Sequence, residues 1–102
     1  MEELKLKGAK DGALYVVLSG DLDLGNAEEF YAETMSAYNA SPANITFDCT
    51  ALNFIDSTTL GTFVKILKNV KLNGHTVRLI ELQPKIKKLF LICSLDKIME
   101  IA

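Results

Sequence analysis

The hydrophobic pattern of this chain changes its period at residues 53–61, which read NFIDSTTLG. The half-apolar segment before them predicts a buried strand, and the apolar residues after them recur at three- and four-residue steps, as in a helix. Asp56 and Ser57 therefore stand where a strand ends and a helix begins. Asp, Ser and Thr side chains cap the free N–H groups of a first helical turn, and the same groups also attract phosphate. The hydroxyl of Ser57 is accordingly either a helix cap or a site of modification.

The first part of the chain predicts a hairpin followed by a helix. Residues 4–10 predict an edge strand, Asp11-Gly12 a tight turn, and the continuous apolar run at 13–18 a strand covered on both faces. The next apolar stripe has helical spacing and predicts a helix over 26–40. Asn26, with a Glu three residues later, is a variant of the capping box and marks the start of that helix.

The second part continues to alternate between strands and helices. Residues 45–49 predict a third strand, and the helix that begins at the junction is expected to end at about Leu72, before Asn73-Gly74. Residues 76–80 predict a fourth strand, and Pro84 suits the first position of a third helix. Residues 96–101 predict a last short strand.

Strands that alternate with helices predict an α/β domain with a mostly parallel sheet and right-handed crossovers. The opening hairpin adds an antiparallel N-terminal edge strand. We therefore expect a mixed sheet of four to five strands packed against three or more helices. The length of 102 residues favours a single domain over 1–102, which is long enough to bury a core without disulfides or metal.

The composition argues against several classes of function. A net charge of -2 gives no basic field for nucleic acid, and the apolar runs are too short for membrane insertion. The N-terminus has no apolar signal core, so we expect a cytoplasmic protein. Cys49 and Cys93 each lie in an apolar stretch, which predicts buried free thiols. Together with a single histidine they form no ligand cluster, so neither a metal nor another cofactor is expected.

An enzyme is not expected either. A serine hydrolase would need a base beside Ser57, but the only histidine, His75, follows the far end of the same predicted helix. At about 1.5 Å per residue the two side chains are on the order of 24 Å apart, which excludes direct proton transfer. The chain also contains no G-x-S-x-G elbow and no Gly-rich phosphate loop.

Three blocks of the sequence carry a resemblance to a known family. They are Gly20-Asp21-Leu22-Asp23, then Phe54-Ile55-Asp56-Ser57 with Leu60-Gly61, and finally Pro84, Ile86 and Leu89-Phe90. In this order they resemble the STAS domain, the fold shared by sulfate transporters and bacterial anti-sigma factor antagonists, over essentially the whole chain. The resemblance implies the α/β fold predicted above.

The resemblance also implies a function. Members of the antagonist family bind an anti-sigma factor when unphosphorylated and so release a sigma factor. The anti-sigma factor is a serine kinase that phosphorylates the serine after the Asp of the middle block, here Ser57, and a serine phosphatase restores the complex. The residues implied to bind this partner are Asp21, Asp23, Asp56, Thr58, Thr59 and Gly61. From its residue type alone, Asp23 suits a turn equally well.

The middle block departs from the family pattern, which usually reads Asp-Ser-Ser-Gly-Leu-Gly. Thr58 replaces the second serine, and Thr59 replaces a glycine beside the acceptor. Ser94 stands where a glycine often follows the third helix. Thr59 leaves a second interpretation open: a STAS scaffold that does not switch, or an accessory subunit of a sensory complex or membrane transporter.

Overall fold

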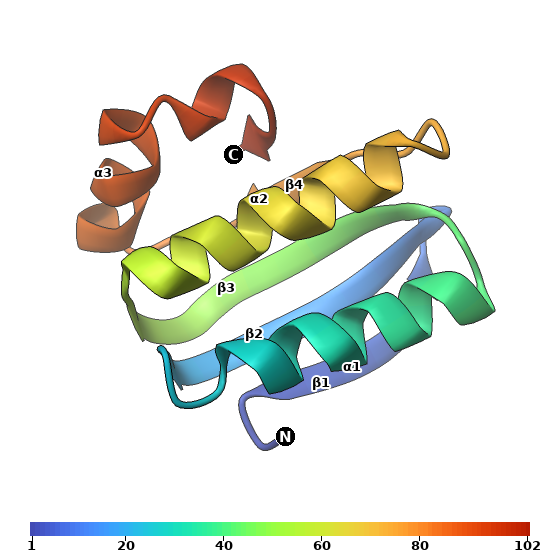
Figure 1. The fold of residues 1–102 in the computed structure, drawn as a ribbon, viewed down its shortest axis with the longest axis horizontal. Helices are drawn as coiled ribbons and strands as arrows, with labels where there is room; N and C mark the ends of the chain where they lie inside the picture. The colour runs from blue at the N-terminus through green and yellow to red at the C-terminus, as the bar shows by residue number, and fades with distance from the viewer.

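A computed structural model describes all residues 1–102 and contains one five-stranded sheet with the strand order β1-β2-β3-β4-β5. In chain order the elements are β1 (Leu4–Lys10), β2 (Ala13–Leu22), α1 (Ala27–Ala40), β3 (Asn44–Ile55), α2 (Ser57–Lys71), β4 (Val77–Ile80), α3 (Pro84–Ile92), a 3-10 turn η1 (Leu95–Lys97) and β5 (Glu100–Ile101). β1 is antiparallel to β2, and the other strand pairs are parallel. The predicted mixed α/β fold is thus confirmed (Figure 1).

The hairpin at the start of the chain forms as predicted. Asp11 and Gly12 both have positive φ, at 54° and 78°, between the paired residues Lys10 and Ala13. Two left-handed residues in a two-residue turn match the twist of the flanking strands, which is why Asp-Gly is favoured there. The hairpin places β1 at the edge of the sheet, where its side chains beyond Leu4 are exposed.

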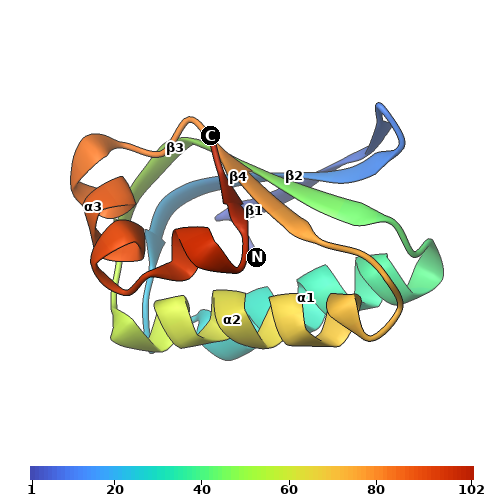
Figure 2. The ribbon, with the colours of Figure 1, turned by 90° about the horizontal axis from the view of Figure 1, so that it is seen from above.

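The sheet has helices on one face only, and this corrects one prediction. α1 and α2 lie side by side below the sheet in Figure 2, while the opposite face carries no helix. Parallel strands that are neighbours in sequence order and joined by right-handed crossovers place their helices on the same side. In β2, Val16 and Leu18 are therefore buried, whereas Tyr15 and Val17 are only half-buried. The apolar run was wrongly taken as a strand covered on both faces.

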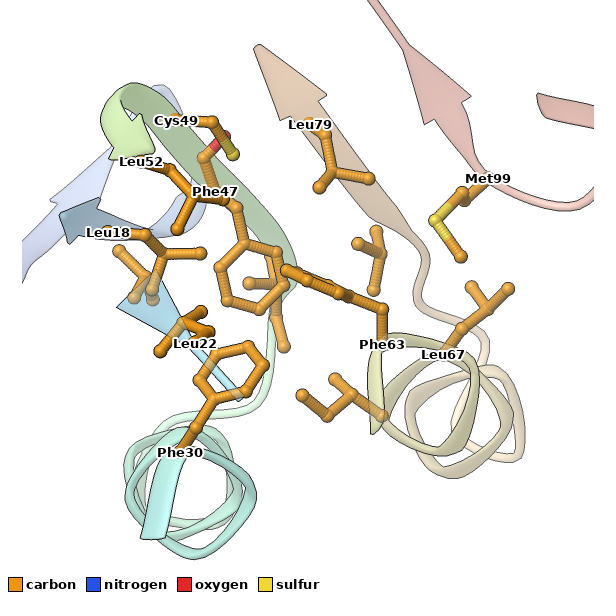
Figure 3. Close-up of a cluster of buried hydrophobic side chains, with 14 of the residues drawn as sticks. Leu18, Leu22, Phe30, Phe47, Cys49, Leu52, Phe63, Leu67, Leu79 and Met99 are labelled. Atoms are coloured by element: carbon orange, nitrogen blue, oxygen red, sulfur yellow. The ribbon is translucent and has the colours of Figure 1, made fainter. Parts of the chain in front are cut away.

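Aromatic side chains fix the two helices on the sheet. Phe30 of α1, Phe47 of β3 and Phe63 of α2 meet edge to face, with ring centroids 5.1–5.8 Å apart (Figure 3). Phe63 also contacts Phe90 of α3 at 5.4 Å. Each such pair adds about 0.5–1.5 kcal/mol beyond the burial of its area. Because Phe63 lies in the second turn of α2, this cluster also fixes the start of that helix.

The two cysteines differ, contrary to the prediction. Cys49 is buried in the core, and this burial raises the pKa of its thiol to about 12. Cys93 is exposed at the end of α3. The apolar stretch around Cys93 is the exposed side of a helix rather than part of the core.

The C-terminus also departs from the prediction. Only Glu100 and Ile101 pair with β4, and the residues before them form the turn η1 instead of a strand. Leu95 and Met99 are the buried residues of this segment, and their spacing of four is helical. The turn is possible because Ser94 adopts a left-handed conformation with φ of 57°.

Candidate functional site

The predicted junction between β3 and α2 is present, and a single residue separates the two elements. Asp56 has an extended backbone and is the N-cap of α2. Its Oδ1 accepts a hydrogen bond of 2.9 Å from the N–H of Thr59, three residues later. The free N–H that a cap must satisfy is therefore satisfied by the aspartate rather than by the serine.

Ser57 is the first residue of α2, and its side chain is exposed. Since Asp56 caps the helix, the interpretation of Ser57 as the cap is wrong. Thr58, the second residue, is exposed as well. The N–H groups of a first helical turn have no acceptor within the helix. The structure therefore presents two hydroxyls at the positive end of a helix dipole.

The same aspartate also holds the loop between β2 and α1. Its Oδ2 accepts a hydrogen bond of 2.9 Å from the backbone N–H of Leu24. The hydrogen bonds from Thr59 and from Leu24 stabilise the carboxylate and lower the pKa of Asp56 below its usual range. Asp56 thus joins two segments that are 32 residues apart in sequence. They lie at the same end of the molecule, where the parallel strands finish (Figures 1 and 2).

The start of α1 differs from the predicted capping box. Asn26 is the N-cap residue, but its side chain makes no capping hydrogen bond. Its oxygen instead accepts from the N–H of Asp23, and its amide donates to the carbonyl of Asp21, both at 2.9 Å. Asp23 in turn accepts from the N–H of Gly25 at 2.9 Å. The side chains of Asp23 and Asn26 therefore order the loop. For Asp23 this is the role of a turn residue, which its residue type also suits.

Thr59 is completely buried, which corrects its assignment as a partner-contacting residue. Its Oγ1 lies 2.8 Å from the carbonyl oxygen of Leu22 and 2.9 Å from Oδ1 of Asp56. The side chain joins the end of β2 to the start of α2 from the inside. It does not lie between the Ser57 hydroxyl and an approaching enzyme.

The other predicted residues lie at one surface. Asp21, Thr58 and Gly61 are exposed, and Asp23 and Asp56 are partly exposed. A Cβ added at Gly61 would meet no atom within 4 Å, so packing within this chain does not require glycine there. All the predicted residues except Thr59 are thus exposed or partly exposed, on the end of β2, the loop after it and the start of α2, which the hydrogen bond between Leu24 and Asp56 joins.

Sequence reasoning missed the apolar part of this edge. Leu24 is 74% exposed and Phe54 is 47% exposed, although both are large hydrophobic residues. Phe54 borders a shallow hollow of about 190 Å³ between the end of β3 and α3, where Lys85 and Leu89 form the other wall. The signal was available, because Leu24 stands between turn residues and Phe54 precedes the inward-facing Ile55.

No three His, Cys, Asp or Glu side chains lie close enough together to hold a metal ion. A model of the STAS domain family matches residues 6–102. The chain belongs to the STAS domain family. None of the helices in this STAS domain has the length and apolar character needed to span a membrane.

Solved structures show the same fold. A Thermotoga maritima protein classed as an anti-sigma factor antagonist is 26% identical, covers 96% of this chain and 84% of its own, and superposes with a TM-score of 0.82. An antagonist from Mycobacterium paratuberculosis is 21% identical, with 96% and 82% covered and a TM-score of 0.80. The Bacillus protein SpoIIAA in its phosphorylated form is 21% identical, with 97% and 90% covered and a TM-score of 0.75. The last two likenesses, below 25% identity, bear on the fold alone.

Proposed function

We propose that this STAS domain is an anti-sigma factor antagonist of the cytoplasm, switched off by phosphorylation of Ser57. In the unphosphorylated state it binds an anti-sigma factor, which is a serine kinase, and so releases a sigma factor. A serine phosphatase reverses the modification. The observation that carries the proposal is the exposed Ser57 hydroxyl at the start of α2, which the helix does not need as a cap.

A phosphate at this position is compatible with the fold. It adds about -1.5 to -2 units of charge, and anions are stabilised at helix N-termini. The first-turn N–H groups of Ser57 and Thr58 are available to it, because Asp56 occupies that of Thr59. The fold that this chain shares with SpoIIAA occurs there in both an unphosphorylated form, with a TM-score of 0.80 to this chain, and a phosphorylated form, with 0.75.

The effect of the phosphate then falls on the partner complex. The unphosphorylated edge combines two exposed apolar side chains, Leu24 and Phe54, with the hydroxyls of Ser57 and Thr58. A dianion at Ser57 would stand beside the carboxylate of Asp56 and would lose its hydration when a partner docks. Burying unpaired charge is costly. A loss of only about 1.4 kcal/mol lowers the affinity tenfold, so moderate repulsion suffices to break the complex.

The alternative of a scaffold that does not switch rested on Thr59. Its complete burial removes that reason, because the side chain cannot obstruct a kinase from the inside of the site. The switching antagonist is therefore the better supported of the two. Catalysis by this chain itself forms no part of the proposal.

Phosphorylation tests the proposal directly. The protein is incubated with ATP and each purified anti-sigma factor kinase of the source genome, and the modified residue is located by mass spectrometry. We expect modification of the parent protein at Ser57, none of Ser57→Ala, and normal modification of the control Thr76→Ala, whose exposed hydroxyl lies beyond the far end of α2. If every kinase leaves the parent unmodified, or modifies it elsewhere, the switch is refuted.

A further inference from the structure

The loop between β2 and α1 presents a large apolar side chain beside Ser57. Leu24 is 74% exposed, more than Phe54 on the same edge. Its backbone N–H donates to Oδ2 of Asp56 at 2.9 Å, and Ser57 directly follows that aspartate. Leu24 and the acceptor serine therefore flank one carboxylate.

The loop that carries Leu24 is held from within. Asp23 accepts from the N–H of Gly25, Asn26 bonds both Asp21 and Asp23, and the carbonyl of Asp23 accepts from the N–H of Asn26 at 3.1 Å. The polar side chains on both sides of Leu24 are thus used to order the backbone. A leucine on an ordered backbone loses little conformational freedom when a partner covers it, so its burial translates into affinity.

We propose that Leu24 is the apolar anchor by which this protein selects its anti-sigma factor, and that Asp56 is the residue that positions it. This inference rests on the function proposed above. The partner that fits this edge is a kinase with an apolar pocket next to its catalytic centre. The pocket receives Leu24 while the catalytic centre reaches the hydroxyl of Ser57.

The size of a stable interface supports the anchor. Such an interface covers about 800 Å² of each protein, which is a disc of about 16 Å radius. The whole domain measures only 31 × 29 × 22 Å. An interface of this size centred on the Ser57 hydroxyl extends over the β2–α1 loop, whose Leu24 N–H lies 2.9 Å from Oδ2 of the neighbouring Asp56. Leu24 has a larger exposed fraction than Phe54, the other large apolar side chain beside the acceptor. Leu72, which is 85% exposed, lies about 22 Å along α2 from Ser57 and falls outside this disc.

Two matched variants, Leu24→Ala and Leu72→Ala, test the anchor. Dissociation constants are measured by calorimetry with the anti-sigma factor kinases of the source genome, and phosphorylation kinetics are measured on the same variants. We expect Leu24→Ala to weaken binding about tenfold or more and to raise KM with kcat unchanged, as loss of uniform binding does. The dissociation constant of Leu72→Ala should stay within about twofold of that of the parent, and both variants should have the Tm of the parent. Equal affinities of the two variants would refute the anchor while leaving the switch intact. If the parent bound none of these kinases, both the proposed function and the anchor would be refuted.

A double-mutant cycle tests the role of Asp56. The variant Asp56→Asn keeps an oxygen for the N–H of Thr59 but places an amide NH₂ opposite the N–H of Leu24, so that two donors face each other. We expect Asp56→Asn to weaken binding by severalfold in the parent and by less than twofold in the Leu24→Ala background. If both backgrounds lose the same factor, Asp56 does not act through Leu24.

Discussion

Replacing Thr59 by valine removes one hydroxyl from the inside of the site and nearly preserves the shape of the side chain. The hydroxyl lies 2.8 Å from the carbonyl oxygen of Leu22 and 2.9 Å from Oδ1 of Asp56, and it has one proton to share between them. Asp56 keeps the N–H groups of Thr59 and Leu24, so the main loss falls on the buried carbonyl. Leaving a buried acceptor without its partner costs about 1–3 kcal/mol.

We therefore expect Thr59→Val to lower the free energy of unfolding by about 2 kcal/mol. For a domain near 100 residues, each kcal/mol shifts the Tm by about 4–8 °C, so the Tm should fall by about 8–16 °C. Urea titration and calorimetry measure both quantities.

The matched control is Thr62→Val on the same helix. The hydroxyl of Thr62 donates to the carbonyl of Thr58 at 3.0 Å, but this residue is half-exposed and water can replace the lost bond. The control should stay within about 0.5 kcal/mol of the parent. If Thr59→Val proved as stable as Thr62→Val, the hydroxyl would not join β2 to α2, and the corrected role of Thr59 would be wrong.

Three further predictions concern charge and thiol chemistry. Ser57→Asp should weaken the anti-sigma factor complex at least about tenfold. Its Tm should change little, because an anion is stabilised at a helix N-terminus. Calorimetric titration with the partner would contradict this prediction if Ser57→Asp bound as tightly as Ser57→Ala. The pKa of Asp56 is lowered in the folded state, so its carboxylate stabilises the fold above the unfolded-state pKa of about 3.9, and this stabilisation is lost as the pH falls through the folded-state pKa. In urea titrations between pH 7 and 3, the free energy of unfolding should therefore fall less steeply for Asp56→Asn than for the parent. A thiol reagent at pH 8 should label Cys93 in the native protein and Cys49 only after unfolding, since burial raises the pKa of Cys49 to about 12; rapid native labelling of Cys93→Ser would contradict the buried position of Cys49.

The order of strands and helices could be predicted because its signals are local. The Asp11-Gly12 turn, the helical stripe of α1 and the change of period at Asp56 each act over a few residues, and each formed where expected. Two of the errors in the fold have different causes, the first distant in sequence and the second local. The apolar run of β2 does not reveal which face the helices will cover, and the segment after α3 became a turn because Ser94 adopts positive φ.

The candidate site was predictable in its location but not in the roles of its residues. The capping residues of a helix are interchangeable in type, so the sequence could not decide whether Asp56 or Ser57 satisfies the N–H of Thr59. It also could not show that Asp56 reaches Leu24, because that contact joins residues 32 positions apart. The resemblance supplied Ser57, and the structure supplied the reason that its hydroxyl is free.

Four consecutive residues of this site divide their side chains between two tasks, and helix geometry explains the division. Asp56 and Thr59 are three positions apart and face the same side, where Asp56 bonds Leu24 of the β2–α1 loop and Thr59 bonds Leu22 at the end of β2. Ser57 and Thr58 lie between them and are exposed. A charge can therefore be added at Ser57 while the inward pair keeps its hydrogen bonds. Because of this separation, a modification at Ser57 changes the binding surface without changing the contacts of the core. It follows that a defect in binding caused by a change at residue 56 or 59 must be interpreted together with stability, whereas a defect caused by a change at residue 57 reports on the surface itself.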